Sequence, residues 1–271
     1  MKKNSLFIVL SLLSVINLTS CLKGNNTSSY VDIGVLDFNM GNVVMRGTGP
    51  AIYSSEINAL NNIDSLQIGG CYLFSYTIDW DLIENSESLF ATNGFYVATL
   101  NGYRPYVKSY ISYPLTDTST IVYNEIPIKD AIFENDTYGY SNGYLFLTHV
   151  IERPEDMSVE LDVTYDFETM KPTVENGIRY YDFFIRATKK NESQKSHDSY
   201  YYSVAYYIRD YLTDAAYNEK NFLTSNNNYD STSKIRLRFN YAAEINGNII
   251  RWSKKEFSIG IEYFISTLSI Y

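Results

Sequence analysis

Apolar and polar residues alternate with a period of two in several segments of this chain. Between residues 159 and 165, valine, leucine and tyrosine alternate with Glu160, Asp162 and Thr164, and the segment from Ile235 to Tyr241 follows the same pattern. Such alternation is typical of β-strands that have one buried and one solvated face. No segment after residue 20 shows a long, capped repeat of 3.6 residues, so we expect helices to be few and short. The pattern therefore predicts an all-β protein.

The predicted strands form two groups, and their spacing changes between Ile126 and Asp130. The first group suits a small closed barrel over residues 31–128. The second group suits an antiparallel β-sandwich over residues 129–271. The predicted strands span residues 31–36, 42–46, 71–78, 95–100 and 106–113 in the first group, and residues 144–151, 159–165, 180–188, 200–208, 234–241, 249–252 and 257–261 in the second.

Turn residues and composition agree with this pattern. Asn246-Gly247-Asn248 separates two apolar runs, and Ser141-Asn142-Gly143 precedes another, as expected of tight hairpins that need positive φ angles. Tyrosine occupies 27 positions and phenylalanine 14, and both are preferred in strands.

The N-terminus has the three parts of an export signal. Lys2 and Lys3 precede an apolar run from Leu6 to Ile16, which is too short for a membrane-spanning helix of about 20 residues. The run ends in Leu18-Thr19-Ser20-Cys21, which resembles a bacterial lipobox. We therefore expect residues 1–20 to be a lipoprotein signal peptide. An ordinary secretory signal that is cut nearby, or an uncleaved one, is the alternative.

The resemblance to a lipobox implies that Cys21 is acylated on its thiol and its amine. Several acyl chains anchor a protein stably, whereas a single chain binds a membrane only marginally. Residues 24–28 are small and polar and have little to bury, so we expect residues 21–30 to form the lipidated end and a flexible tether. The membrane is thus the first predicted partner, through the N-terminal lipid.

The charge of the chain argues against nucleic acid as a partner. The formal net charge is -9, and removal of Lys2 and Lys3 with the signal peptide takes away two positive charges, which gives -11. Phosphate backbones are bound by clustered lysines and arginines, and here these residues form no block larger than a pair.

No common catalytic or cofactor signature is present, and we predict no catalytic residue, metal or cofactor. Cys71 lies beside an apolar run and is expected to be a buried small hydrophobe, since a lipidated Cys21 cannot pair with it. His149 has the phase of a buried strand position, which favours a structural histidine, and His197 is expected at a solvated hairpin.

Two acidic residues carry the alternative of an enzyme. Asp79 and Asp81 flank Trp80 and would point to the same side of an extended chain, which suits a glycosidase or a cation site. A solvated strand end is the simpler interpretation of this pair.

A series of tyrosines between Tyr200 and Tyr211 is the candidate ligand-binding feature. If the whole segment is extended, aromatic rings cover both faces of the strand. One face would pack into the core and the other would present rings to a sugar or a protein. The simpler interpretation is that tyrosine suits a half-buried strand. The candidate ligand-binding residues are Tyr200, Tyr202, Tyr206 and Tyr207.

The chain resembles the NigD-like lipoproteins of Bacteroidetes. The resemblance rests on the lipobox at Cys21, on the segment from Leu66 to Ile78, on Phe95-Tyr-Val97, and on the runs Tyr144–Thr148 and Tyr181–Ile185. It implies an N-terminal OB-like barrel and a C-terminal β-sandwich. It implies an immunity-like role only by association, through the bacteriocin operon that gave the family its name.

These observations predict a non-enzymatic lipoprotein of the cell envelope that binds a protein or a glycan. The alternatives are an enzyme that acts on polysaccharide through an acidic pair, and an immunity-type protector against a co-encoded toxin. In Bacteroidetes lipoproteins, surface export is associated with acidic residues just after the cysteine, and Leu22 to Asn26 contains none. By that resemblance we expect an outer-membrane anchor and a periplasmic face.

Overall fold

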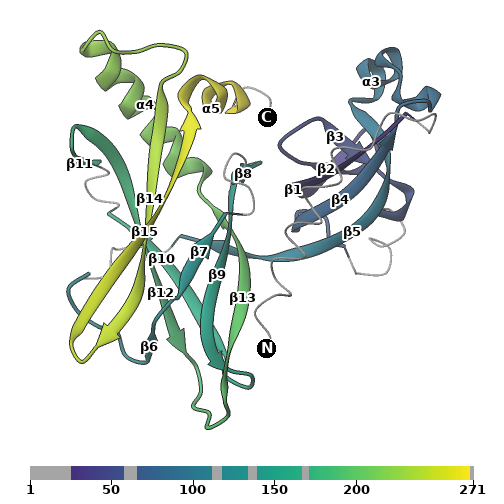
Figure 1. The fold of residues 1–271 in the computed structure, drawn as a ribbon. Helices are drawn as coiled ribbons and strands as arrows, with labels where there is room; N and C mark the ends of the chain where they lie inside the picture. The colour runs from purple at the N-terminus through teal and green to yellow at the C-terminus, as the bar shows by residue number, and fades with distance from the viewer. Residues whose placement is uncertain (1–25, 58–65, 112–117, 134–138, 167–170, 269–271) are drawn as a thin grey trace.

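The computed structural model describes residues 26–57, 66–111, 118–133, 139–166 and 171–268, and Cys21 and the signal peptide lie outside these ranges. Figure 1 shows two β-structures, a small barrel and a larger sandwich, which are connected by one long strand. No helix in the described ranges is long and apolar enough to cross a membrane.

The barrel consists of β1 (Thr27–Asn39), β2 (Asn42–Arg46), β3 (Ala51–Tyr53), β4 (Cys71–Asp79) and β5 (Phe95–Tyr110). The strands follow the order β3-β2-β1-β4-β5, and parallel pairing of β3 with β5 closes the sheet on itself. The predicted small barrel is therefore confirmed.

The barrel interior is filled by alternate residues of its strands. On β4, Phe74 is fully buried, and Tyr72, Tyr76 and Ile78 are each less than 10% exposed. Leu36 of β1 packs into the same cluster. Burial of one such side chain stabilises the fold by about 1.5–3 kcal/mol, so this cluster accounts for the closure of the barrel.

A short helical segment connects β4 to β5. It contains η2 (Ile83–Asn85) and α3 (Glu87–Asn93), and α3 ends at Gly94, which has a positive φ of 72°. The buried amide of Asn85 donates to the carbonyls of Asp79 and Val97, at 2.8 and 2.9 Å, and accepts from the Val97 N–H at 2.7 Å. These bonds fix the segment to both strands.

The sandwich has two sheets. The first continues from β5 through β13 and β9 to β7, with β8 on β9, and the second has the order β10-β12-β14-β15, with β11 and β6 on β12. The strands are β6 (Glu125–Ile126), β7 (Asp130–Ile132), β8 (Tyr140–Ser141), β9 (Tyr144–Pro154), β10 (Val159–Tyr165), β11 (Thr173–Glu175), β12 (Ile178–Lys189), β13 (His197–Tyr207), β14 (Lys234–Asn246) and β15 (Ile249–Gly260).

Two helices lie at one end of the sandwich (Figure 1). They are α4 (Arg209–Ser225) and α5 (Ile261–Leu268), and both contribute buried side chains to the core between the sheets, among them Leu212 and Phe264. The predicted fold class, a barrel followed by a β-sandwich, is confirmed.

Strand β5 belongs to both parts of the molecule. It pairs antiparallel with β4 between Ala98 and Tyr106, and then parallel with β13 between Val107 and Tyr110. A small buried cluster where the two parts meet includes Cys71, Tyr106 and Phe146. Burial raises the pKa of the Cys71 thiol to about 12, so this cysteine is an unreactive small hydrophobe, as predicted.

Several strand predictions differ from the structure. The predicted strands at 95–100 and 106–113 are one strand as far as Tyr110, and those at 249–252 and 257–261 are one strand that ends at Gly260. The short strand β3 was not predicted. The sandwich is not purely antiparallel, because β12 pairs in parallel with β14 and β13 pairs in parallel with β5.

The expectation of short helices was wrong for α4, which has 17 residues. Its N-cap, Ile208, makes no side-chain capping bond, and its buried face includes Glu219. Glu219 accepts hydrogen bonds from Arg179 and Tyr181 at 2.8 and 2.9 Å. The helix carries an apolar repeat at Tyr211, Leu212, Ala215 and Ala216, but it has no side-chain cap, and its inner face continues with the charged Glu219.

The ends of the two predicted domains also differ from the structure. Strand β1 starts at Thr27, inside the predicted tether of residues 21–30, because its first residues pair with β4 as far as Asp79. Strand β6 precedes residue 128 but pairs with β12 of the sandwich. The pairing therefore changes from barrel to sandwich within β5 rather than at residue 128.

Candidate functional site

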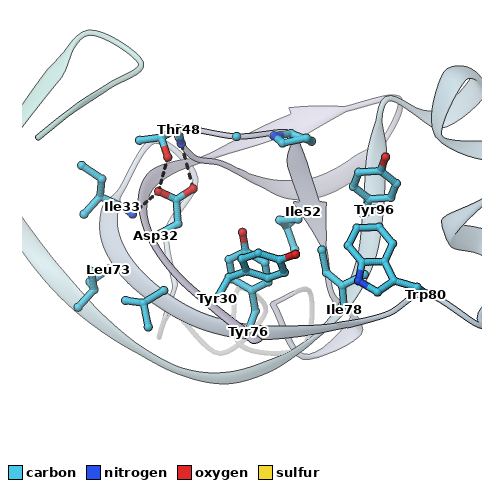
Figure 2. A pocket seen from close by; sticks show the side chains of 13 residues that line it. Tyr30, Asp32, Ile33, Thr48, Ile52, Leu73, Tyr76, Ile78, Trp80 and Tyr96 are labelled. Carbon is cyan, nitrogen blue, oxygen red and sulfur yellow. Dashed lines mark hydrogen bonds between the residues drawn. The ribbon is translucent and has the colours of Figure 1, made fainter. Parts of the chain in front are cut away.

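The barrel carries a hollow of about 460 Å³, which we call the barrel hollow. Figure 2 shows its lining side chains, which come from β1, the loop between β2 and β3, β3, β4 and β5. Its volume lies within the range of small-molecule and side-chain pockets, about 300–1,000 Å³. Four aromatic residues and one carboxylate define its chemistry: Tyr30, Tyr76, Trp80, Tyr96 and Asp32.

Tyr30 and Tyr76 form a stacked pair in the barrel hollow (Figure 2). They are opposite each other in the antiparallel pairing of β1 with β4, and their ring centroids are 5.5 Å apart with an interplanar angle of 28°. Tyr76 is buried, whereas Tyr30 is 40% exposed. The inner ring therefore supports the outer one, which remains available to a ligand.

Trp80 and Tyr96 form a second aromatic wall. The Trp80 ring lies edge-on to Tyr96 with centroids 5.2 Å apart, and Tyr96 stacks on Phe90 of α3 at 4.3 Å. The indole N–H of Trp80 donates to the Ser28 hydroxyl at 3.0 Å, which fixes the orientation of the ring. Both walls are thus held in place before a ligand binds.

Asp32 holds the loop at the edge of the barrel hollow. Its carboxylate accepts hydrogen bonds from the Thr48 N–H at 3.0 Å, the Thr48 hydroxyl at 2.8 Å and the Ile33 N–H at 2.8 Å. Burial raises the pKa of Asp32, and these hydrogen bonds act in the opposite direction. A Cβ at Gly47 would lie 2.1 Å from Oδ2 of Asp32, so any larger residue there would force the Asp32 carboxylate to shift.

The same loop is fixed to the sandwich on its other side. The carbonyl of Arg46 accepts from the Asn142 amide at 2.6 Å, and that of Gly47 accepts from the Ser141 hydroxyl at 3.0 Å. A second hollow of about 300 Å³ lies there and is lined by residues of both parts, including Arg209. The loop from Arg46 to Pro50 therefore separates the two hollows.

The charge of the barrel hollow is negative. Asp32 is the one charged side chain among the described residues that line it, and these include no lysine, arginine or histidine. An anionic ligand would find no countercharge in the hollow.

The predicted tyrosine site does not assemble as expected. Tyr206 is fully buried, and its hydroxyl lies 2.8 Å from Nε2 of His149, so it cannot contact a ligand. Tyr200 and Tyr202 are half-buried and pack against Arg153, whose guanidinium lies 4.0 Å from the Tyr200 ring centroid.

Tyr207 lies on the other face of β13 from these three residues, against Tyr144 and Tyr110, with ring centroids 5.3 and 6.1 Å away. Tyr211 is in α4, because the strand ends at Tyr207. The four candidates point to two faces of one strand and line neither hollow.

The two histidines and the acidic pair considered from the sequence do not line the barrel hollow. Burial lowers the pKa of His149 to about 3, so this histidine is neutral and structural, as predicted. His197 is exposed at the start of β13. Asp79 accepts from the Asp81 N–H at 3.0 Å, and Asp81 accepts from the Asn26 N–H at 3.3 Å, so both carboxylates bond to nearby backbone. No three metal-ligating side chains are clustered in the described ranges.

Sequence reasoning did not find the barrel hollow. Its residues are spread from Tyr30 to Tyr96, and they meet only because the barrel closes. One signal was available, since Tyr72, Phe74, Tyr76, Ile78 and Trp80 alternate along and just beyond β4.

Comparisons with known proteins agree with this architecture. Residues 24–104 match the model of a family described as Lipoprotein OB domain. No curated protein matches the chain. The fold is similar to the crystal structure of an uncharacterized protein from Parabacteroides merdae, with a TM-score of 0.66, 20% identity, and coverage of 86% of this chain and 99% of that chain.

Two further crystal structures are similar. One is a putative toxin-related protein from Parabacteroides distasonis, with a TM-score of 0.53, 10% identity, and coverage of 90% of this chain and 100% of that chain. The other is a NigD-like immunity protein from Bacteroides caccae, with a TM-score of 0.46, 10% identity, and coverage of 89% of this chain and 99% of that chain.

The barrel that carries the hollow thus matches an OB domain and is followed by a β-sandwich. Residues 24–104 are similar to a lipoprotein OB domain, which agrees with the predicted lipid anchor and with the resemblance to the NigD-like lipoproteins of Bacteroidetes.

Proposed function

We propose that this protein is a non-enzymatic lipoprotein that binds an envelope protein or glycan in the barrel hollow. The observation that carries the proposal is the pair of preformed aromatic walls, with the exposed Tyr30 ring in front of Tyr76 and the oriented Trp80 ring beside Tyr96. Rigid aromatic side chains in a concave site are typical of ligand-binding surfaces.

The arrangement of carboxylates supports binding rather than hydrolysis. Glycoside cleavage uses two carboxyl groups about 5–10 Å apart on either side of the bond. Asp32 is the one carboxylate among the described lining residues, and its oxygens hold the loop. Asp79 and Asp81 lie outside the lining and bond to backbone N–H groups.

The anchor would place the hollow close to the membrane. If Cys21 is lipidated, residues 22–26 separate it from β1, and an extended chain of that length spans at most about 18 Å. Tyr30, near the N-terminal end of β1, lines the hollow. We propose an outer-membrane anchor with the domains on the periplasmic face, since Leu22 to Asn26 has no acidic residue.

Site-specific photocrosslinking in cells tests this function. A benzophenone amino acid replaces Tyr30 in the full-length lipoprotein, and the matched control carries it in place of Tyr201, which is 59% exposed on β13. After irradiation and detergent extraction, the attached proteins and glycans are identified. We expect a specific adduct from position 30 and none of the same composition from position 201. Identical adducts from both positions, or none from position 30, would contradict the proposal.

A further inference from the structure

We propose that the ligand of the barrel hollow is an extended segment of a partner protein, which pairs as an added strand with the open edge of β1. This inference rests on the proposed function and specifies the partner's conformation and chemistry. Addition of a strand to a sheet edge obtains affinity from backbone hydrogen bonds and specificity from pockets for alternate side chains.

The pairing register leaves one edge of β1 open. β4 pairs with β1 from Thr27 to Val35, whereas β2 pairs with it only from Val35 to Asn39. Within the described part of the chain, residues 27–34 therefore have a neighbouring strand on one edge alone. The loop after Arg46 covers the end of this edge nearest β2, because a Cβ at Gly34 would lie 2.5 Å from the Arg46 carbonyl oxygen and Thr48 bonds to Asp32, so the open edge comprises residues 27–31.

Two backbone hydrogen bonds show which backbone groups face that edge. The Leu36 N–H donates to the Gly70 carbonyl at 3.0 Å, and the Asn26 carbonyl accepts from the Trp80 N–H at 2.8 Å. Both even-numbered residues thus direct their backbone groups toward the β4 side. Because backbone groups alternate along a strand in antiparallel pairing, those of Ser29 and Val31 face the open edge.

The barrel hollow lies at this same edge. Side chains alternate along a strand, so Tyr30 and Asp32 share the inward side of Leu36, whereas Val31 and Ile33 point to the opposite face. Tyr30, Val31, Asp32 and Ile33 all line the hollow, and Figure 2 shows Tyr30, Asp32 and Ile33 there. A hollow can reach both faces of one strand only around an edge that no strand covers, so the edge of β1 at residues 27–31 is accessible among the described residues.

The chemistry of the hollow describes the partner segment. The rings of Tyr30, Trp80 and Tyr96 suit apolar or aromatic side chains, which an extended segment presents at every second residue. Asp32 is the one charge among the described lining residues, and the whole chain carries a net charge of -9. An apolar or basic segment complements this surface, and an acidic segment or an anionic glycan does not.

A peptide library tests the inference on the ligand side. A phage-displayed library of linear dodecapeptides is selected on the detergent-solubilised full-length lipoprotein, and an enriched peptide is synthesised with single backbone N-methyl groups along its length. N-methylation removes one N–H donor at a time. We expect the affinity to fall at least tenfold at every second position and to change little between, which is the period of strand pairing.

Two variants of Val31 test the protein side. Val31→Pro removes the N–H that faces the open edge and leaves the β4 ladder intact, since that N–H does not point to β4. Val31→Ala shortens the side chain and keeps the N–H. We expect peptide binding to weaken at least tenfold in the proline variant and clearly less in the alanine variant, which alters the lining of the hollow but keeps the N–H. Thermal unfolding followed by circular dichroism shows whether both variants fold.

Three results would overturn the inference. The first is a set of N-methyl effects on affinity without a period of two. The second is a folded Val31→Pro variant that binds the peptide as tightly as the unsubstituted protein. The third is that no peptide is enriched, while neutral hexasaccharides of glucose or mannose bind and Tyr30→Ala abolishes their binding. The third result would leave the proposed function in place, because the hollow would still be the binding site.

Discussion

The buried pair of His149 and Tyr206 predicts a specific loss of stability in mild acid. His149 is fully buried between the sheets of the sandwich, and its Nε2 is 2.8 Å from the Tyr206 hydroxyl. Its Nδ1 is buried without a hydrogen-bond partner among the described residues. A protonated imidazole at this position would be a buried charge with no carboxylate in hydrogen-bond contact.

The pKa values give the direction and size of the effect. Burial lowers the pKa of His149 from 6.5 to about 3 in the folded protein. The stability that the neutral histidine provides is therefore complete above pH 6.5 and is lost as the pH falls toward 3, because the unfolded chain takes up a proton that the folded chain does not. Between pH 7 and pH 5, this linkage lowers the free energy of unfolding by about 2 kcal/mol.

The assay compares the pH dependence of the chain with that of His149→Gln, whose side chain does not titrate. Urea unfolding at pH 7 and pH 5 is followed by Trp252 fluorescence in a Trp80→Phe background, so that the signal comes from the sandwich alone. Carboxylates and the exposed His197 contribute equally to the pH dependence of stability in both proteins. Their contributions cancel when the change in the free energy of unfolding is compared between the two proteins. An equal loss of stability in both proteins between the two pH values would refute the burial of a neutral histidine.

Three further predictions concern the ion pair, the loop and the anchor. Glu125→Gln should destabilise the sandwich by about 3–5 kcal/mol in urea unfolding, because it removes one partner of a buried ion pair with Arg186 at 2.7 Å; an effect below 1 kcal/mol would contradict it. Gly47→Ala should lower the barrel's stability by about 1–3 kcal/mol, since the new methyl group would overlap Asp32; an unchanged Trp80 unfolding midpoint would contradict it. Cys21→Ser should abolish labelling by alkyne-palmitate and release the protein from membranes, and retained labelling would show another anchor.

The fold was predictable from the sequence wherever apolar and polar residues alternate along a single strand. The predicted bounds of β2 and β10 are those of the structure. The predicted strands at residues 95–100 and 106–113 left a gap at residues 101–105, but β5 continues through it, because it pairs with β4 on either side of a bulge. Strand β3 has three residues, which is too short for alternation to be recognised.

The candidate binding site was not predictable in the same way. Local pattern favoured the tyrosine series of β13, yet the packing of two sheets buries Tyr206 and turns Tyr207 to the other face. The barrel hollow instead depends on closure of the barrel, which places Tyr30 against Tyr76 and Trp80 against Tyr96. It also depends on a register that, among the described strands, leaves half of β1 with one neighbouring strand, and register is not visible in a single strand.

The fluorescence of Trp80 in a Trp252→Phe protein tests the central claim, that the barrel hollow is the binding site. The chain has two tryptophans, so the variant reports from the hollow alone. The partner or peptide captured by the full-length lipoprotein is titrated into this variant, and again into the same variant with Tyr30→Ala or Tyr201→Ala. We predict a saturable change in Trp80 emission that is at least tenfold weaker in affinity with Tyr30→Ala and unchanged with Tyr201→Ala. Binding that saturates without any change in Trp80 emission, and with full affinity in Tyr30→Ala, would contradict the account.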